Sequence, residues 1–513
     1  LLRAANQARR GRRFAEADAL YSDLQARFAA SRAARTSRVP HGRLLLDTLD
    51  RPADALAAFS AYLDADPLEP YGFSGWVGPE PHGAAMSNSG FRRDPLVADR
   101  VVAWLEDRYA RRRAGDADAL KPFLLVASFV NPHDIVLFPG WVRRSPLLDY
   151  PVLEPPHVPA APTATEDLSD KPAAQAAFRE AYYSGYGPAA VIERTYRRNA
   201  QQYRDLYYRL HAEVDGPLDR VRRAVTEGGS ENAVLVRTSD HGDLLGAHGG
   251  LHQKWFNLYD EATRVPFVIA RIGADATAAR EIEAPTSHVD LVPTLLGAAG
   301  VDVEATAETL AATFSEVHPL PGRDLMPVVN GAAAEQDRPI YLMTRDNILE
   351  GDTGASGAAQ AIGANTNPPA LLRIRVPANV AANFEGLVAR VSNADAPGGS
   401  GHLWKLVRTF DDPATWTEPG VRHLAANSRG GDTYRTDPLD DQWELYDLTA
   451  DPIEATNRWA DPNLLELRQH LRTHLKQVRT ASVPERNEPW PYVNRRPPEP
   501  GSAIRKLLCR FRQ

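Results

Sequence analysis

This sequence of 513 residues has a single cysteine, no long apolar run and no surplus of basic charge. Its single cysteine, Cys509, excludes a disulfide framework and a cysteine-ligated zinc site. With a net charge of -7, the sequence does not have the excess of basic residues that is typical of nucleic-acid-binding proteins, so we expect no nucleic-acid partner. The longest apolar run, residues 123–130, is too short to span a bilayer, so we expect no membrane association.

A secretory leader is also missing from the start of the sequence. No charged segment followed by an apolar segment opens the chain. This favours a cytoplasmic location, but the first residue is Leu1 and not methionine, so export stays undecided.

Residues 1–67 are rich in alanine, arginine, leucine and aspartate, and this composition predicts helices. Ala55, Phe59 and Pro67 have the spacing of the second helix of a tetratricopeptide repeat. Such arrays need about three units to bury a continuous face, so an ordinary amphipathic helical hairpin explains the segment as well. If the protein has a protein partner, we expect it to bind this helical segment.

Alternating strand and helix patterns predict an α/β core over residues 68–345. Residues 123–130 have the continuous apolar character of a fully buried strand, which is typical of parallel sheets. Residues 203–221 carry apolar side chains at helical spacing, and short apolar runs at 233–236 and 266–270 predict two further strands. We therefore expect a mostly parallel central sheet flanked by helices.

The residue composition changes again towards the C-terminus. Residues 351–370 are rich in glycine, alanine, asparagine and threonine, which predicts a loop or insertion. Residues 403–408 and 443–448 predict strands of a smaller sheet, so we expect a smaller C-terminal α+β subdomain over residues 346–480. Residues 481–513, rich in proline and arginine, predict a surface tail.

Asp240 and His241 are the first candidate site residues. They follow the predicted strand at 233–236, and open α/β sheets bind ligands at the carboxyl ends of their strands. A carboxylate oxygen and an imidazole nitrogen can both bind a divalent metal ion. An isolated Asp-His-Gly sequence also fits a turn in which the aspartate hydrogen-bonds the backbone.

His133 and Lys254 are two further candidates. His133 comes at the exit of the apolar run at 123–130, and Lys254 lies downstream of a glycine-rich turn, where an ammonium group suits an anionic ester. A single histidine after a strand is usually structural, and an exposed lysine is usually solvated. Neither residue identifies a site by itself.

The order of these residues and of the blocks around them resembles the sulfatase family of the alkaline phosphatase superfamily. The resemblance covers roughly residues 70–470 and implies an alkaline phosphatase-like fold. The matching positions, in chain order, are residues 121–126, 131–133, 215, 239–243, 254, 259–261, 264–266, 290–296, 322–325 and 444–457.

The resemblance implies a role for each candidate. Asp240 and His241 match the second pair of metal ligands in the family, where Ca²⁺ is most common and Mg²⁺ or Mn²⁺ is an alternative. His133 matches the histidine that contacts the sulfate group, and Lys254 matches the lysine that holds a sulfate oxygen and the ester oxygen. The expected substrate is a small-molecule sulfate ester.

Three features of the family do not precede Tyr71 in this sequence. They are a strand ending in two adjacent metal-binding aspartates, a Cys/Ser-x-Pro-x-Arg motif whose first residue becomes formylglycine, and a Gly-Lys-Trp-His-like block. Ser482 begins a formal match to the nucleophile motif, but it follows the whole family pattern, and Asp47 and Asp50 are not adjacent. We therefore expect that residues 1–67 replace the first part of a sulfatase, or are joined onto a sulfatase whose first part is missing.

Three functions stay open at this point. The first is a metal-dependent sulfuric ester hydrolase, impaired as written because the formylglycine nucleophile and the first aspartates are absent. The second is a phosphonate or phosphodiester hydrolase of the same superfamily, since phosphate esters present a similar tetrahedral oxyanion. The third is a non-catalytic sulfatase-like binding protein.

Overall fold

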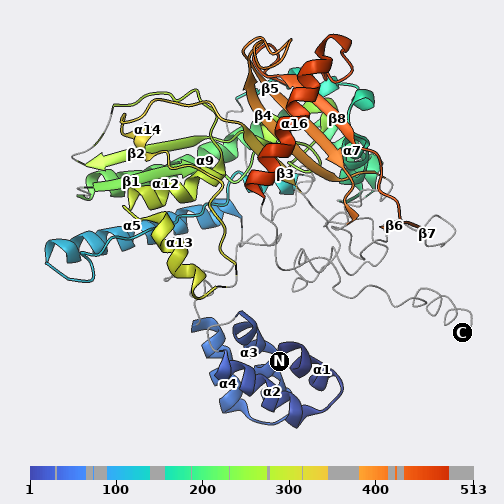
Figure 1. Cartoon of the computed structure of the whole chain (residues 1–513). Coiled ribbons are helices and arrows are strands. Elements are labelled where there is room, and N and C mark those ends of the chain that lie inside the picture. Colours follow the sequence, from blue (N-terminus) through green and yellow to red (C-terminus); the bar gives the residue numbers. More distant parts are fainter. Residues whose placement is uncertain are drawn as a thin grey trace, which may run out of the picture. The chain divides into compact units, whose positions relative to one another are not determined.

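The chain divides into two compact units, residues 1–81 and 82–513, as seen in a computed structural model (Figure 1). The structure describes residues 1–28, 32–64, 73, 89–138, 156–185, 188–229, 232–273, 276, 278–314, 316–344, 380–413, 422–424 and 433–483. The expected boundaries at 67/68 and 345/346, the insertion at 351–370 and Cys509 all lie outside these residues.

The first unit consists of helices in its described part. They are α1 (Leu2–Arg10), α2 (Phe14–Arg27), α3 (Arg32–Asp47) and α4 (Pro52–Asp64). Ala5, Ala8 and Ala17 are fully buried beside Tyr21 and Leu44, so small side chains let these helices approach closely. The similarity to tetratricopeptide helices, and a partner for this unit, stay predictions.

Two long helices of the second unit, α5 (Gly90–Arg113) and α9 (Ala200–Glu227), pack against each other. Val101 and Leu105 of α5 meet Val221 of α9 in a shared apolar cluster. The apolar spacing that predicts a helix over 203–221 therefore reflects a real buried face.

Residues 123–130 do not form the fully buried strand that their sequence predicts. Leu125, Ala127 and Phe129 pack partly against the cluster between α5 and α9, while Leu124 and Val126 stay 57% and 65% exposed. Such alternating exposure of successive side chains is typical of an extended chain that is covered on one face. The described residues include no ladder partner for the segment, so the prediction of a fully buried strand was wrong.

The strand before the candidate metal ligands is β1 (Asn232–Thr238), which pairs with β2 (Phe267–Gly273). The pairing is antiparallel and sets Leu235 opposite Ala270. Both strands lie where the apolar runs predict them. The chain is an α/β protein, and the parallel pairs expected for its central sheet are not among the ladders of the described residues.

A second sheet forms the C-terminal part of this unit, with strand order β3-β4-β5-β8 and antiparallel pairing throughout. Its strands are β3 (Ile340–Thr344), β4 (Asn383–Val391), β5 (His402–Phe410) and β8 (Gln442–Asp447). The strands predicted at 403–408 and 443–448 fall within β5 and β8.

The two faces of this sheet cover different parts of the unit. Leu406 and Leu445 face the helix α16 (Leu465–Ser482), which crosses the sheet in Figure 1 and buries Leu467 and Leu471 against it. The opposite face carries Val407 and Tyr446, which pack into the apolar cluster that also contains Phe256 and Leu258. The second face therefore meets the segment that follows the candidate site.

Shorter elements connect these parts. They are η3 (His133–Leu137), η4 (Pro162–Thr165), η5 (Leu168–Asp170), α7 (Ala173–Gly185), α8 (Ala189–Arg198), α10 (Ala247–Gly250), α11 (Asp260–Thr263), η6 (His288–Asp290), α12 (Leu291–Ala298), α13 (Val303–Ala311), α14 (Met326–Val329), β6 (Arg422–Leu424), β7 (Thr433–Arg435) and η8 (Pro462–Leu464). Within the described ranges, every helix is too short or too polar to cross a bilayer.

Candidate active site

The candidate metal ligands Asp240 and His241 lie in the turn directly after β1. Nδ1 of His241 is 2.8 Å from the carbonyl oxygen of Gly242. Nε2 of the same ring is 3.4 Å from Oδ2 of Asp240, and the Asp240 side chain is 83% exposed. The carboxylate and the imidazole therefore lie side by side in this turn, where both side chains can reach one divalent cation.

Gly242 holds this turn against α11. Its N–H donates to the carbonyl oxygen of Ala262 at 2.9 Å. A Cβ at this position would lie 2.0 Å from the carbonyl oxygen of Glu261, a backbone atom that cannot move aside easily. The close approach therefore requires glycine, and it couples the metal-ligand turn to α11.

Asp243 closes the loop that leads from the turn to Lys254. Its Oδ1 accepts hydrogen bonds from the N–H groups of Leu245 (2.8 Å) and Gln253 (3.2 Å). Burial raises the pKa of Asp243, while these two donors, Lys254 and His241 act in the opposite direction. The loop therefore returns Lys254 to the neighbourhood of the turn from which the loop started.

Lys254 is half-buried, and its ammonium nitrogen lies 5.2 Å from the centre of the Trp255 ring. On the opposite side of the turn, Tyr207 of α9 has a raised pKa because it is buried, and the charges of Asp243 and Asp240 raise it further. These residues therefore share one electrostatic environment at the end of β1.

His133 lies on a separate segment, as the exposed first residue of η3. Its N–H donates to the carbonyl oxygen of Val130 at 3.0 Å. The next residue, Asp134, is buried and accepts from the N–H of Gly90 at 2.8 Å, and burial raises its pKa to about 6. Because η3 packs against α9, the same helix supports His133 and approaches the Asp240 turn through Tyr207.

A divalent metal ion fits this turn only in part. Ca²⁺ takes about six to eight oxygen ligands, and Asp240 with His241 supplies two side chains. Across the described ranges, no group of three or more His, Cys, Asp or Glu side chains converges on a point. The pair suits a divalent cation by its chemistry, but further ligands are needed to hold the ion firmly.

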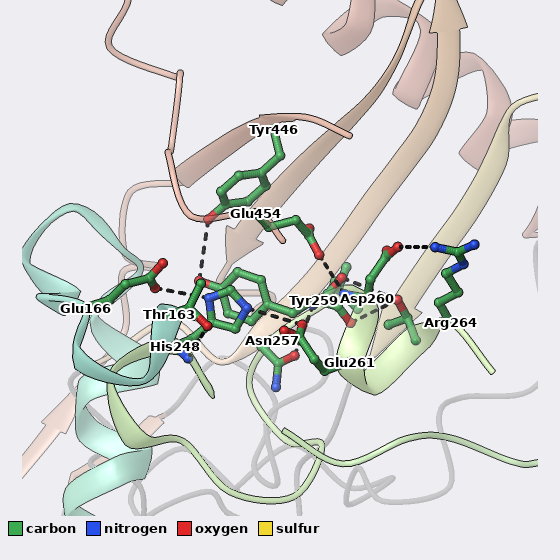
Figure 2. A network of polar contacts seen from close by, with 12 residues as sticks. Thr163, Glu166, His248, Asn257, Tyr259, Asp260, Glu261, Arg264, Tyr446 and Glu454 are labelled. Atoms are coloured by element: carbon green, nitrogen blue, oxygen red, sulfur yellow. Dashed lines mark hydrogen bonds and ion pairs between the residues drawn. The ribbon is translucent and has the colours of Figure 1, made fainter. Parts of the chain in front are cut away.

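Behind the site, α11 is tied to the C-terminal sheet by a buried ion-pair group. The ammonium of Lys405 on β5, fully buried, lies 2.5 Å from Oδ1 of Asp260 and 2.8 Å from Oε1 of Glu454. Glu454 also accepts the N–H of Asp260 at 2.6 Å, as Figure 2 shows. These three side chains fix the start of α11.

Tyr259 adds a second link from the same segment. Its hydroxyl donates to Oε1 of Gln175 (2.9 Å), and Glu444 of β8 provides another acceptor at 3.2 Å. The sequence alone identifies the blocks 259–261 and 444–457 as matching the family pattern. It does not reveal that these two blocks bind each other, because about 190 residues separate them.

Comparisons with known proteins point to one family. The family model described as Sulfatase matches residues 53–301. The choline-sulfatase of Rhizobium meliloti is 30% identical over 252 residues, which are 48% of this chain and 42% of that protein. The uncharacterized sulfatase YidJ of Escherichia coli (strain K12) is 29% identical over 207 residues, which are 40% of this chain and 36% of YidJ.

Among solved structures, the phosphonate monoester hydrolase of Agrobacterium radiobacter aligns with a TM-score of 0.42 and 20% identity, over 80% of this chain and 65% of that one. The chain spans less than half the length of the two curated relatives named above. The family match covers β1, the Asp240 turn, the loop to Lys254 and β2. The matched part of this chain, residues 53–301, is a sulfatase-family domain.

Proposed function

We propose that this chain forms the metal-ligand and anion-binding half of a metal-dependent sulfuric ester hydrolase. In this proposal Asp240 and His241 bind the divalent ion, with Ca²⁺ preferred over Mg²⁺ or Mn²⁺. His133 and Lys254 contact the sulfate group of a small-molecule ester. The observation that supports it most is the proximity of two potential metal ligands, Nε2 of His241 and Oδ2 of Asp240 at 3.4 Å, in a turn whose loop brings back Lys254.

The chemistry of these groups suits ester hydrolysis. Negative charge grows on the leaving oxygen as an S–O bond breaks, and an ammonium group beside that oxygen stabilises it. An imidazole beside the sulfate oxygens orients the group by hydrogen bonding. A divalent ion, when bound, supplies Lewis-acid stabilisation of the same charge.

The nucleophile is the part that this sequence does not supply. The family uses a formylglycine made from a Cys/Ser-x-Pro-x-Arg motif, and no such motif precedes Tyr71. The formal match at Ser482 begins at the last residue of α16, and most of it lies outside the described residues. We therefore propose that the 513 residues bind the metal ion and the ester but turn over little or no substrate.

Steady-state assays of the purified 513-residue chain test this proposal. Aryl sulfate, aryl phosphodiester and aryl phosphonate substrates are compared in the presence of Ca²⁺, with Asp240→Ala as the matched variant. We expect no turnover above that of Asp240→Ala on any of the three. Sulfate ester hydrolysis that Asp240→Ala abolishes would show that the chain is a complete enzyme, and hydrolysis of the phosphorus esters alone would reassign its substrate class.

Equilibrium binding of a sulfate-ester mimic tests whether Lys254 and His133 contact the anion. An unreactive aryl sulfonate probe is titrated into the chain, and into Lys254→Ala and His133→Ala. We expect each substitution to weaken binding about tenfold, which corresponds to about 1.4 kcal/mol. If both variants bind the probe as the natural chain does, these residues do not contact the anion.

A further inference from the structure

The loop between the Asp240 turn and Lys254 contains a histidine that the proposed reaction leaves unused. His248 is fully buried, with its Nδ1 3.0 Å from Oε2 of Glu166 and its Nε2 3.2 Å from Oε2 of Glu261. Figure 2 shows the imidazole between the two carboxylates. The ring also stacks on that of Tyr259, with centroids 3.6 Å apart and planes 7° from parallel.

The geometry determines the protonation state of this ring. A carboxylate only accepts hydrogen bonds, so a nitrogen facing one must donate. Both nitrogens of His248 face carboxylates, and the ring is therefore an imidazolium cation. Stacking on the electron-rich face of Tyr259 stabilises the same cation.

The charges around the ring agree with this assignment. Burial lowers the pKa of His248, but hydrogen bonds and charges from Glu261 and Glu166 outweigh burial and raise it overall. Burial raises the pKa of Glu261, but His248 and, more weakly, Lys405 outweigh it, so the pKa is lowered. Among the described residues, Asp243 and Lys254 are charged groups at the two ends of this loop, and Arg179 of α7 donates to the carbonyl oxygen of Gly249 at 2.8 Å.

The backbone of this loop needs such a support. Leu245, His248, Gln253 and Phe256 all have positive φ angles between 46° and 63°, a region that non-glycine residues adopt only at a cost in free energy. Backbone bonds within the loop include Leu244 N–H to the Gln253 oxygen at 2.8 Å and Gly246 N–H to the Leu251 oxygen at 2.7 Å. The side chain of His248 adds links from the loop to the segments around it.

We propose that His248 is a positioning residue, whose imidazolium bridges Glu166 and Glu261 and thereby holds the loop that places Lys254 beside the Asp240 turn. We call this contact the His248 bridge. It joins the segment after η4, the site loop and α11, and α11 is the element that binds Gly242. The role in positioning substrate contacts rests on the proposed function, whereas the bridge itself does not.

The bridge makes the loop sensitive to pH in a defined direction. The raised pKa of His248 means that its contribution to stability is fully present below the ordinary imidazole pKa and is lost as the pH rises through the pKa of the folded state. The lowered pKa of Glu261 means that its contribution is lost as the pH falls through that lowered value. The loop is held best between these two limits.

Nuclear magnetic resonance tests the protonation state directly. The full chain is labelled at histidine with ¹³C and ¹⁵N, and the His248 signals are assigned by their absence in His248→Gln. We expect imidazolium shifts at pH 7, where an ordinary histidine is mostly neutral, and a lower transition in Glu261→Gln. A neutral His248 at pH 7 would overturn the proposal.

Hydrogen exchange tests whether the bridge holds the loop. In the natural chain, we expect the exchange protection of the Leu244, Gly246 and Leu251 amides to decrease as the pH rises through the pKa of His248. In His248→Gln, we expect this protection to be at least about tenfold lower and to show no such alkaline decrease. The matched control is His252→Gln, because His252 is buried in the same loop but its pKa, lowered to about 3 by burial, keeps it neutral. Equal protection in His248→Gln and the natural chain would overturn the proposal, as would loss of the alkaline decrease in His252→Gln.

Probe binding then links the bridge to the site. We expect His248→Gln to weaken the aryl sulfonate probe about as much as Lys254→Ala, and adding His248→Gln to Lys254→Ala to weaken it no further. Unchanged probe affinity in His248→Gln, with the loop unprotected, would refute the positioning role. If Lys254→Ala itself leaves affinity unchanged, the proposed function fails, while the protonation and exchange results still decide the bridge.

Discussion

At the scale of single residues, the buried charges of the second unit are neutralised in small groups. Lys405 is the centre of one group, with Asp260 and Glu454 as its partners. Burial lowers the pKa of Lys405, but the two carboxylates outweigh burial and raise it. Burial raises the pKa of Glu454 to about 7, with Lys405 acting against it.

Glu454 predicts a measurable pH dependence of stability. An acid whose pKa is raised in the folded state takes up a proton on folding, so the folded state gains stability as the pH falls from 8 through 7 towards the ordinary glutamate value. We expect this group to add up to about 3 kcal/mol between pH 8 and pH 5, and Glu454→Gln to lose that increment. Thermal unfolding at both pH values measures it. An unchanged pH response in Glu454→Gln would contradict the assignment, with exposed Glu466→Gln as the control.

Gly242 predicts a steric effect at the metal-ligand turn. Gly242→Ala places a methyl group against the Glu261 carbonyl oxygen, and we expect a loss of about 1–3 kcal/mol in unfolding free energy together with weaker metal binding. Gly216→Ala is the matched control, because this glycine lies inside α9 with open space around it. We expect the control to gain about 0.5–1 kcal/mol. Equal effects of the two substitutions in denaturant titrations would argue against the close approach.

At the scale of elements, the local sequence pattern predicts individual helices and strands better than it predicts which segments contact each other. Helical spacing over 203–221 predicts α9, and short apolar runs predict β1 and β2, because these elements bury the faces that their sequences mark. The fully buried strand at 123–130 was predicted wrongly, because burial on both faces depends on neighbours that local sequence does not describe. The His248 bridge could not be predicted either, since Glu166 lies 82 residues before His248.

The segment at 123–130 gives a direct test of its two faces. Leu124 is exposed and Leu125 packs partly against the α5 and α9 cluster, so the same change to alanine probes both sides. We expect Leu124→Ala to change the unfolding free energy by less than about 0.5 kcal/mol, and Leu125→Ala to cost about 1–2 kcal/mol. Urea titration measures both values. A large loss in Leu124→Ala would indicate a covered strand.

At the scale of the whole second unit, the C-terminal sheet supports the site from behind. Lys405, Glu444, Tyr446 and Glu454 all contact the segment 258–262, which in turn contacts Gly242 and His248. The sequence could predict the family and the α/β class, because these depend on blocks of local sequence. It could not predict which blocks touch, because that is set by packing between distant elements.

The central claim is that Asp240 and His241 form part of a divalent-metal site, and calcium titration calorimetry of the purified chain tests it most directly. The natural chain, Asp240→Asn, His241→Ala and the exposed control Asp118→Asn are titrated under one set of conditions. With two protein side chains as ligands, we predict one weak site with a dissociation constant of about 1 mM, weakened at least about tenfold in Asp240→Asn and His241→Ala and unchanged in Asp118→Asn. Calcium binding that is equal in all four proteins, or absent from the natural chain, would contradict the account.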